Sequence, residues 1–142
     1  MRVLALDVGD KTIGVALSDE LKITARGLFT LERISNKKDT SKIIELIDEH
    51  KCSTLVIGLP LNLDNSDSVQ TQKVRDFETL LKNKLTSTGH KNIEVVLYDE
   101  RFSTKIAEKV LIEADVSRAK RKEVIDMQAA VVILQGYLEA LR

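Results

Sequence analysis

The chain has 142 residues, 43% of them hydrophobic, which is enough to bury the core of one compact domain spanning residues 1–142. Lys plus Arg and Asp plus Glu number 22 each, so the formal net charge is zero and affinity for a polyanion must come from local clusters of charge. The single cysteine, Cys52, excludes an internal disulfide and suits a reducing cytosol, and no apolar run is long enough to cross a bilayer. We therefore expect a cytoplasmic protein that has no membrane partner.

Apolar periodicity predicts strands first and then helices along the chain. The runs typical of strands lie at 2–8, 12–19, 23–31, 54–58 and 93–98. The runs with helical spacing lie at 40–51, 69–85, 106–114 and 121–141, with loops at 34–39, 60–68 and 115–120. Three antiparallel strands followed by two parallel ones give an α/β fold with a mixed five-stranded sheet flanked by helices.

The N-terminal apolar run stops on Asp7 and Gly9 and resumes at Ile13. Desolvating a carboxylate is costly unless a cation or hydrogen-bond donors compensate, so Asp7 should have a partner. Gly9 and Gly14 suit a tight connection between two strands. We expect Asp7 to stand at the end of a strand with its side chain turned toward an open site.

Further carboxylates are predicted near this strand end. The strand at 93–98 leads into Asp99 and Glu100 at the carboxyl edge of the sheet, where open α/β sheets build their sites, and either acid could face Asp7. On the last helix, Asp126 shares the inward face with four residues at helical spacing: Ala129, Ala130, Ile133 and Tyr137. The small alanines would let that helix approach the sheet closely.

Carboxylates that converge at one edge repel each other unless a divalent cation lies between them. Mg²⁺ or Mn²⁺ takes oxygen ligands, and a pair of such ions can clamp the attacking water and the leaving oxygen of a phosphodiester. We expect Asp7, Glu100 and Asp126 to be both metal ligands and catalytic residues. The alternative gives each acid a local role: Asp7 in an Asx-turn, Glu100 solvated at a strand end and Asp126 near a helix start.

Four segments resemble, in this order, the motifs of the bacterial YqgF family: DVGDKTIGVALSD at 7–19, VIGLPL at 56–61, DERFST at 99–104 and DMQAAVVILQGYL at 126–138. The resemblance implies a ribonuclease H-like fold and an acidic, metal-dependent nuclease site formed by Asp7, Glu100 and Asp126. It also implies maturation of the 5′ end of precursor 16S ribosomal RNA, with the pre-30S ribosomal particle as a partner, or resolution of Holliday junctions in DNA. Thr12 stands where the family usually has arginine, and Asn65 stands where glycine is common. The first departure bears on affinity for phosphate, and neither touches an acid.

Basic residues lie near each predicted acid in the sequence. Lys11 and Arg101 flank Asp7 and Glu100, and a cluster precedes Asp126: Arg118, Lys120, Arg121 and Lys122. These residues could bind a phosphate backbone, although the cluster could also be an ordinary solvated surface. Aromatic residues are only 4% of the chain, which favours recognition of the backbone or the shape of a nucleic acid over stacking on its bases.

Three alternatives to an RNA nuclease stay open. A DNA junction resolvase would use the same acids and should be a homodimer, because it cuts two strands symmetrically, whereas an RNA nuclease could be a monomer. An ATP-binding protein could hold phosphate in the hairpin around residues 9–12, but actin-like ATPases close two such domains around the nucleotide and this chain has room for one. A non-catalytic RNA-binding assembly factor could keep the three acids for stability.

Overall fold

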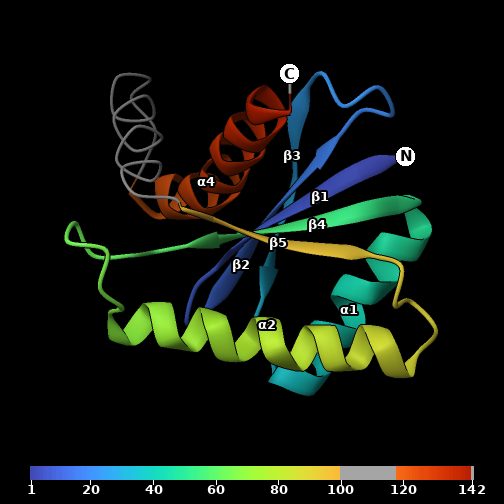
Figure 1. The fold of residues 1–142 in the computed structure, drawn as a ribbon. Helices are drawn as coiled ribbons and strands as arrows, with labels where there is room; N and C mark the ends of the chain where they lie inside the picture. The colour runs from blue at the N-terminus through green and yellow to red at the C-terminus, as the bar shows by residue number, and fades with distance from the viewer. Residues whose placement is uncertain (100–117, 142) are drawn as a thin grey trace.

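The computed structural model describes residues 1–99 and 118–141, and within 118–126 the course of the chain alone. These residues form one mixed sheet with helices on both faces (Figure 1). The strands are β1 (Arg2–Val8), β2 (Thr12–Ser18), β3 (Ala25–Glu32), β4 (Cys52–Leu59) and β5 (Glu94–Asp99). The helices are α1 (Asn36–Glu49), α2 (Val69–Ser87) and α4 (Arg118–Ala140).

The strands of the described sheet follow the order β3-β2-β1-β4-β5. β2 is antiparallel to both β1 and β3, whereas β4 is parallel to both β1 and β5. This topology confirms the predicted mixed sheet, in which three antiparallel strands are followed by two parallel ones. Since β1, β4 and β5 run in one direction, their carboxyl ends meet at one edge of the sheet, where α/β folds usually place their sites.

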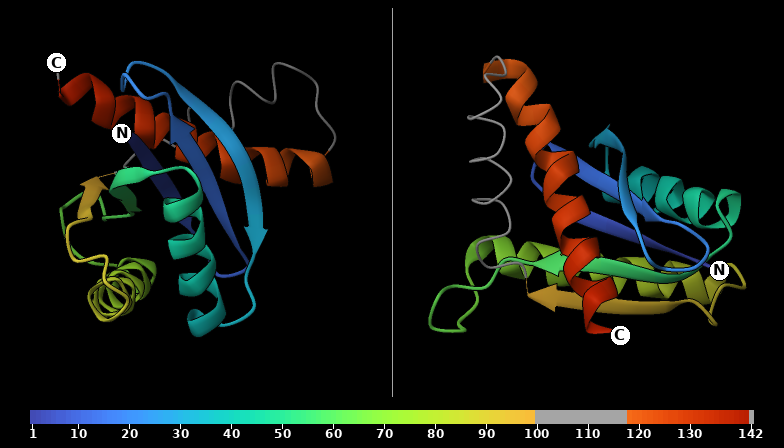
Figure 2. Two further views of the ribbon diagram at one scale, coloured as in Figure 1. Left: turned by 90° about the vertical axis from the view of Figure 1, so that its right-hand side faces the viewer. Right: turned by 90° about the horizontal axis from the view of Figure 1, so that it is seen from above.

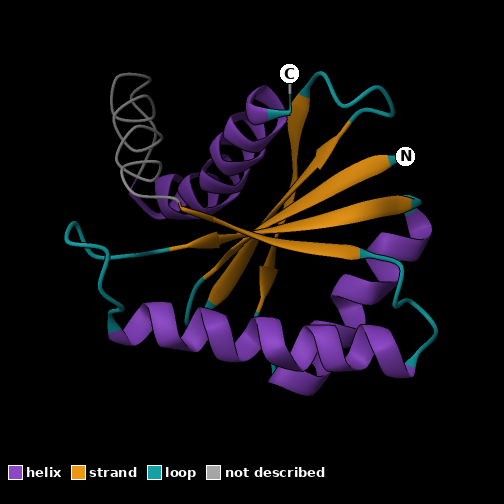
Figure 3. Ribbon diagram, in the orientation of Figure 1, coloured by secondary structure: helices purple, strands orange, loops and turns teal. Residues whose placement is uncertain are grey.

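Helices α1 and α2 cover one face of the sheet, and α4 covers the other (Figures 1 and 3). Successive side chains of a strand point to opposite faces. In β1, Leu4 and Leu6 belong to the larger core under α1 and α2, whereas Val3 and Ala5 belong to the smaller core under α4. Each face of the sheet is therefore closed by its own apolar core.

Helix α1 begins earlier than the sequence predicted. The hydroxyl of Ser35 caps the helix by accepting the backbone N–H of Lys38 at 3.2 Å, so the helix starts at Asn36 rather than at residue 40. Asp39, which resembles a loop residue in the sequence, is only 2% exposed because it pairs with Arg33 at 3.0 Å. The predicted loop at 34–39 is therefore wrong over most of its length.

Two other boundaries also differ from prediction. β3 begins at Ala25 rather than at residue 23, because the carboxylate of Asp19 accepts the backbone N–H groups of Ile23 and Thr24 at 2.7 and 2.9 Å and holds them in a turn. α4 begins at Arg118, so residues 118–120 are helical instead of belonging to a loop. The helix predicted at 106–114 lies outside the described residues.

No helix in the described part of the chain is both long enough and apolar enough to cross a lipid bilayer. The assignment of residues 1–142 to one domain stays a prediction.

Candidate functional site

Asp7 lies one residue before the end of β1, at the edge where the three parallel strands end. Its side chain is partly exposed. Because Val3 and Ala5 pack in the core under α4, the alternation of the strand places Asp7 on the same face. Asp7 thus stands at a strand end, as expected, and on the face of the sheet that α4 covers.

Glycines occupy the positions beside Asp7 on both neighbouring strands. Gly14 of β2 pairs directly with Asp7, and Gly58 of β4 follows Ile57, the partner of Leu6. Gly14 was expected in the connection between strands but lies inside β2. Neither position places a side chain next to the carboxylate, which is typical of a strand that a ligand or another backbone approaches closely.

The turn between β1 and β2 is closed by its own backbone. The N–H of Gly9 donates to the carbonyl of Thr12 at 2.9 Å. The need for glycine at this position is steric, because the φ of Gly9 is not positive but a Cβ there would lie 3.0 Å from the oxygen of Thr12. Lys11, predicted to contact phosphate, is exposed in this turn.

Asp99 is the last residue of β5, at the same edge as Asp7. It alternates with Val95 and Leu97, which pack against the core under α1 and α2, so Asp99 stands on the face opposite to Asp7. Of the two acids considered at this strand end, Asp99 therefore does not share the face of Asp7. The other, Glu100, and its neighbour Arg101 lie outside the described residues.

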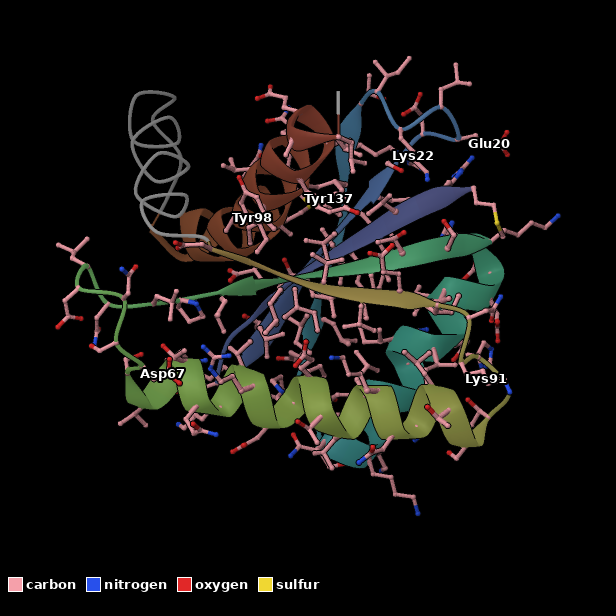
Figure 4. The ribbon with its side chains drawn as sticks, in the orientation of Figure 1. Glu20, Lys22, Asp67, Lys91, Tyr98 and Tyr137 are labelled. Carbon is pink, nitrogen blue, oxygen red and sulfur yellow. The ribbon has the colours of Figure 1, made fainter. Side chains whose placement is uncertain are left out.

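Helix α4 crosses the sheet on the face that bears Asp7 (Figure 2). Near the middle of α4, Met127 packs so closely on Gly27 of β3 that a Cβ on Gly27 would lie 2.6 Å from the Cγ of Met127. Near its end, Gly136 lies against the ring of Tyr98 of β5, the tyrosine that Figure 4 labels on that strand. Two glycines, one on the sheet and one on the helix, therefore let α4 approach the sheet closely.

Asp126 precedes Met127 in α4, so its backbone belongs to this closely packed helix, but its side chain lies outside the described residues. Ala129 and Ala130 are fully buried, as their predicted inward positions require. The basic cluster lies in the first turns of α4 and not in a loop before it: Arg118, Lys120, Arg121 and Lys122. Their side chains, too, are beyond the described part.

The loop between β4 and α2, predicted at 60–68, forms a small folded arm. Leu61 and Asp67 make an isolated antiparallel bridge, and Asn65 has a φ of 69°, which asparagine adopts more readily than most residues. Asn65 thus suits a position where the family commonly has glycine. Arg75 donates two hydrogen bonds to Asp67, at 2.9 and 3.2 Å, and this pairing raises the pKa of Arg75. Leu63 at the tip is 73% exposed.

Sequence reasoning missed three polar side chains that contact the turn after β1. Arg33 and Gln70 donate hydrogen bonds to backbone carbonyls of residues 8 and 9, and Lys73 forms an ion pair of 3.0 Å with Asp10. The only sequence signal was position, because Arg33 directly follows β3 and Gln70 stands two residues after Ser68, the N-cap of α2. Neither signal names the partner.

Within the part of the chain whose side chains are described, no three His, Cys, Asp or Glu residues gather as a metal site would require. Of the predicted ligands, only Asp7 belongs to that part, so the ligand set stays a prediction. Cys52 is not a ligand for a hard cation, because it is buried and burial raises the pKa of its thiol to about 11.

Comparison with known proteins agrees with the fold. The profile of the RuvX family, described as Holliday junction resolvase, matches residues 1–140. A protein of Thermoanaerobacter pseudethanolicus named "Putative pre-16S rRNA nuclease" is 50% identical over 99% of this chain and 97% of its own length. Proteins of the same name from Clostridium tetani and Clostridium botulinum are 45% and 44% identical, each over 99% of this chain and 98% of their own length.

Solved structures show the same architecture at low sequence identity. The fowlpox virus resolvase in complex with Holliday junction DNA has a TM-score of 0.63 at 13% identity and covers 99% of both chains. RuvC of Thermus thermophilus, bound to a Holliday junction substrate, has a TM-score of 0.61 at 13% identity over 99% of this chain and 95% of its own. The chain therefore belongs to the RuvX family, also called YqgF, a family of nucleases with the ribonuclease H-like fold.

Proposed function

We propose that this protein is a metal-dependent nuclease that hydrolyses RNA and processes the 5′ end of precursor 16S ribosomal RNA. The observation that carries the proposal is the placement of Asp7, partly exposed at the end of β1 with glycine on both flanking strands. The relatives that are 44–50% identical over nearly their whole length, and that are named for pre-16S rRNA, support the choice of substrate.

Asp7, Glu100 and Asp126 would hold Mg²⁺ or Mn²⁺, two ions in all. Carboxylate oxygens are the ligands that these hard cations prefer, and the partly exposed carboxylate beside Gly14 fits a bound cation. When bound, such ions lower the pKa of a water and stabilise charge on the leaving oxygen of the phosphodiester. The chain itself holds Asp7 at the end of β1 and supplies basic side chains that would bind the substrate.

Exposed basic residues would bind the phosphate backbone around the acids. Lys11 is exposed in the turn after the strand that carries Asp7, which suits a phosphate on the substrate beside the scissile one. Arg101 and the cluster in the first turns of α4 would extend this contact: Arg118, Lys120, Arg121 and Lys122. Because the chain has no net charge, this local contact must supply the electrostatic part of the affinity.

A DNA junction resolvase is the second candidate. The description of the family and the likeness in fold to two resolvases in complex with junctions favour it, and it would use the same acids. The relatives from Thermoanaerobacter and Clostridium, which are far more similar in sequence than these resolvases, are named for RNA, and this ranks RNA first. For the RNA role we propose a location in the cytoplasm and the pre-30S particle as partner. A monomer would suffice for this role, whereas a resolvase would act as a homodimer.

Cleavage assays test the proposal directly. RNA carrying the 16S 5′ leader, free and within immature small subunits, is compared with a four-way DNA junction, with and without Mn²⁺. We expect the wild type and the control Asp19→Asn to remove the leader only with metal, and Asp7→Asn to leave it intact. Cleavage of the junction alone would select the resolvase. Metal-independent RNA binding without cleavage would select a non-catalytic assembly factor.

A further inference from the structure

The turn that follows β1 is held by side chains that come from other elements. Gln70, in the first turn of α2, donates its Nε2 to the carbonyl of Val8 at 3.1 Å. Arg33, at the end of β3, donates its Nη1 to the carbonyl of Gly9 at 3.1 Å. Two consecutive carbonyls of the turn are therefore bound by residues 62 and 24 positions away in the sequence.

Arg33 is fixed in place by several partners at once. Its Nε donates to the carboxylate of Asp39 at 3.0 Å, its Nη2 donates to Asn36 at 2.6 Å, and its guanidinium lies 5.1 Å from the ring centre of Phe77 in α2. The side chains of Arg33 and Asp39 are only 17% and 2% exposed. Lysine could not replace this arrangement, because only the planar guanidinium presents donors in several fixed directions. Arg33 thus ties the turn to both α1 and α2.

Gln70 has an equally firm support. Its neighbour Thr71 is fully buried, and the hydroxyl of Thr71 donates to the carbonyl of Pro60 at the end of β4. Ser68 caps the same helix by accepting the backbone N–H of Thr71 at 3.1 Å. Thr71 therefore fixes the start of α2 to the residue that follows β4. From this fixed position Gln70 contacts the end of β1.

Asp7 directly precedes the two residues whose carbonyls are bound by Gln70 and Arg33. Its neighbours across the sheet are Gly14 and Gly58, so side-chain packing from these positions does not hold it. We infer that Arg33 and Gln70 are positioning residues that clamp the turn after β1 and thereby fix the carboxylate of Asp7. The inference rests on the proposed role of Asp7. A displacement of about 1 Å at a reacting group can cost on the order of 100-fold in rate.

Two substitutions and two matched controls test the clamp. Gln70→Ala removes one side of it, and its control is Gln72→Ala, an exposed glutamine of the same helix whose side chain donates to Asp76 at 2.9 Å. Arg33→Lys keeps the charge but removes the planar guanidinium and its several donors. Its control is Arg75→Lys, which alters the exposed pair with Asp67. Each variant is measured for melting temperature, for kcat and KM on the leader RNA, and for amide hydrogen exchange at residues 8–11. The Asp7 carboxyl is followed by ¹³C NMR.

We expect Gln70→Ala to lower kcat by about 10- to 100-fold with KM within about twofold, and to speed exchange in the turn, while Gln72→Ala changes neither. Arg33→Lys should do the same as Gln70→Ala, with a lower melting temperature. Equal behaviour of Gln70→Ala and Gln72→Ala would overturn the clamp. If the wild type cleaves nothing, the proposed function fails separately. Exchange and the Asp7 carboxyl resonance then decide, since a shift in Gln70→Ala alone supports the clamp and unchanged spectra refute it.

Discussion

The two turns of the N-terminal meander are built in different ways. Side chains from distant segments hold the turn between β1 and β2: Arg33 directly follows β3, and Gln70 and Lys73 belong to α2. The turn between β2 and β3, which contains Glu20 and Lys22 in Figure 4, is organised from inside by the carboxylate and carbonyl of Asp19.

This difference agrees with the end of the sheet at which the site is proposed. The β2–β3 turn leaves Leu21 77% exposed and places Lys22 at a φ of 60°, as a surface hairpin can. The β1–β2 turn connects to α1 and α2 within a few residues of Asp7. Contacts between distant segments restrict motion of a turn much more than contacts within it, and catalytic carboxylates need such restriction. The turn with more tertiary contacts is therefore the one beside the candidate site.

Removing one carboxylate near each turn should give the largest difference in activity between the two ends of the sheet. We expect Asp7→Asn to reduce metal-dependent cleavage of leader RNA to the background rate, because a proposed metal ligand loses its charge. Asp19→Asn should cleave at the wild-type rate. Rates at saturating Mn²⁺, with circular dichroism to verify folding, provide the measurement. An active Asp7→Asn would remove this residue from the site.

Breaking the support of the β1–β2 turn should strongly lower stability. Asp39→Ala leaves Arg33 without its buried partner, and we expect the free energy of unfolding to fall by about 3–5 kcal/mol. Asp48→Ala, on the same helix, breaks an exposed pair with His90 and should cost less than about 1 kcal/mol. Urea denaturation measures both values. Similar losses in the two variants would mean that the buried pair does not stabilise the turn.

A methyl group beside Asp7 should affect activity without a comparable loss of stability. Gly14→Ala places a side chain next to the carboxylate, and we expect kcat to fall by about tenfold. Replacing glycine by alanine inside a strand also removes an entropic penalty, so the melting temperature should not fall to match. Steady-state kinetics and calorimetry on the same preparation test this. Unchanged kcat would show that the space beside Asp7 is not used.

The smallest effect concerns the charge at the β2–β3 turn. Hydrogen bonds from the backbone of Thr24 and then Ile23 hold the pKa of Asp19 below its usual value. A carboxylate with a lowered pKa stabilises the fold above its usual pKa, and this contribution is lost as the pH falls through the lowered value. The difference in melting temperature between wild type and Asp19→Asn should thus be larger at pH 7 than at pH 2.5. A constant difference would contradict this explanation.

Local patterns predicted the sheet well because its strands have long apolar runs. The run from Val3 to Leu6 and the β-branched run of β4 are buried on both faces, and two covered faces are what continuous apolar strands indicate. The start of α1 was missed because Asp39 and its neighbours are polar. Their burial depends on Arg33, a tertiary partner that composition does not reveal.

Only those features of the candidate site that depend on where a strand ends and on the alternation of its side chains could be predicted from the sequence. Asp7 at the end of β1 follows from the interruption of an apolar run. The opposite orientation of Asp99 follows from the parity of its strand, once the end of β5 is known. The contacts of Gln70 and Arg33 with the turn span 62 and 24 residues, and both end on carbonyl groups that every residue possesses. The sequence alone therefore does not reveal which groups Gln70 and Arg33 contact.

The single thiol has a practical consequence for the study of folding. Cys52 begins β4, pairs with Arg2 of β1, and is 2% exposed, and burial raises the pKa of its thiol to about 11. At neutral pH it is both protonated and shielded, so an alkylating reagent can reach it only when the core under α1 and α2 opens around it. The rate of alkylation therefore measures how often this core opens, in the native sequence and without an added label.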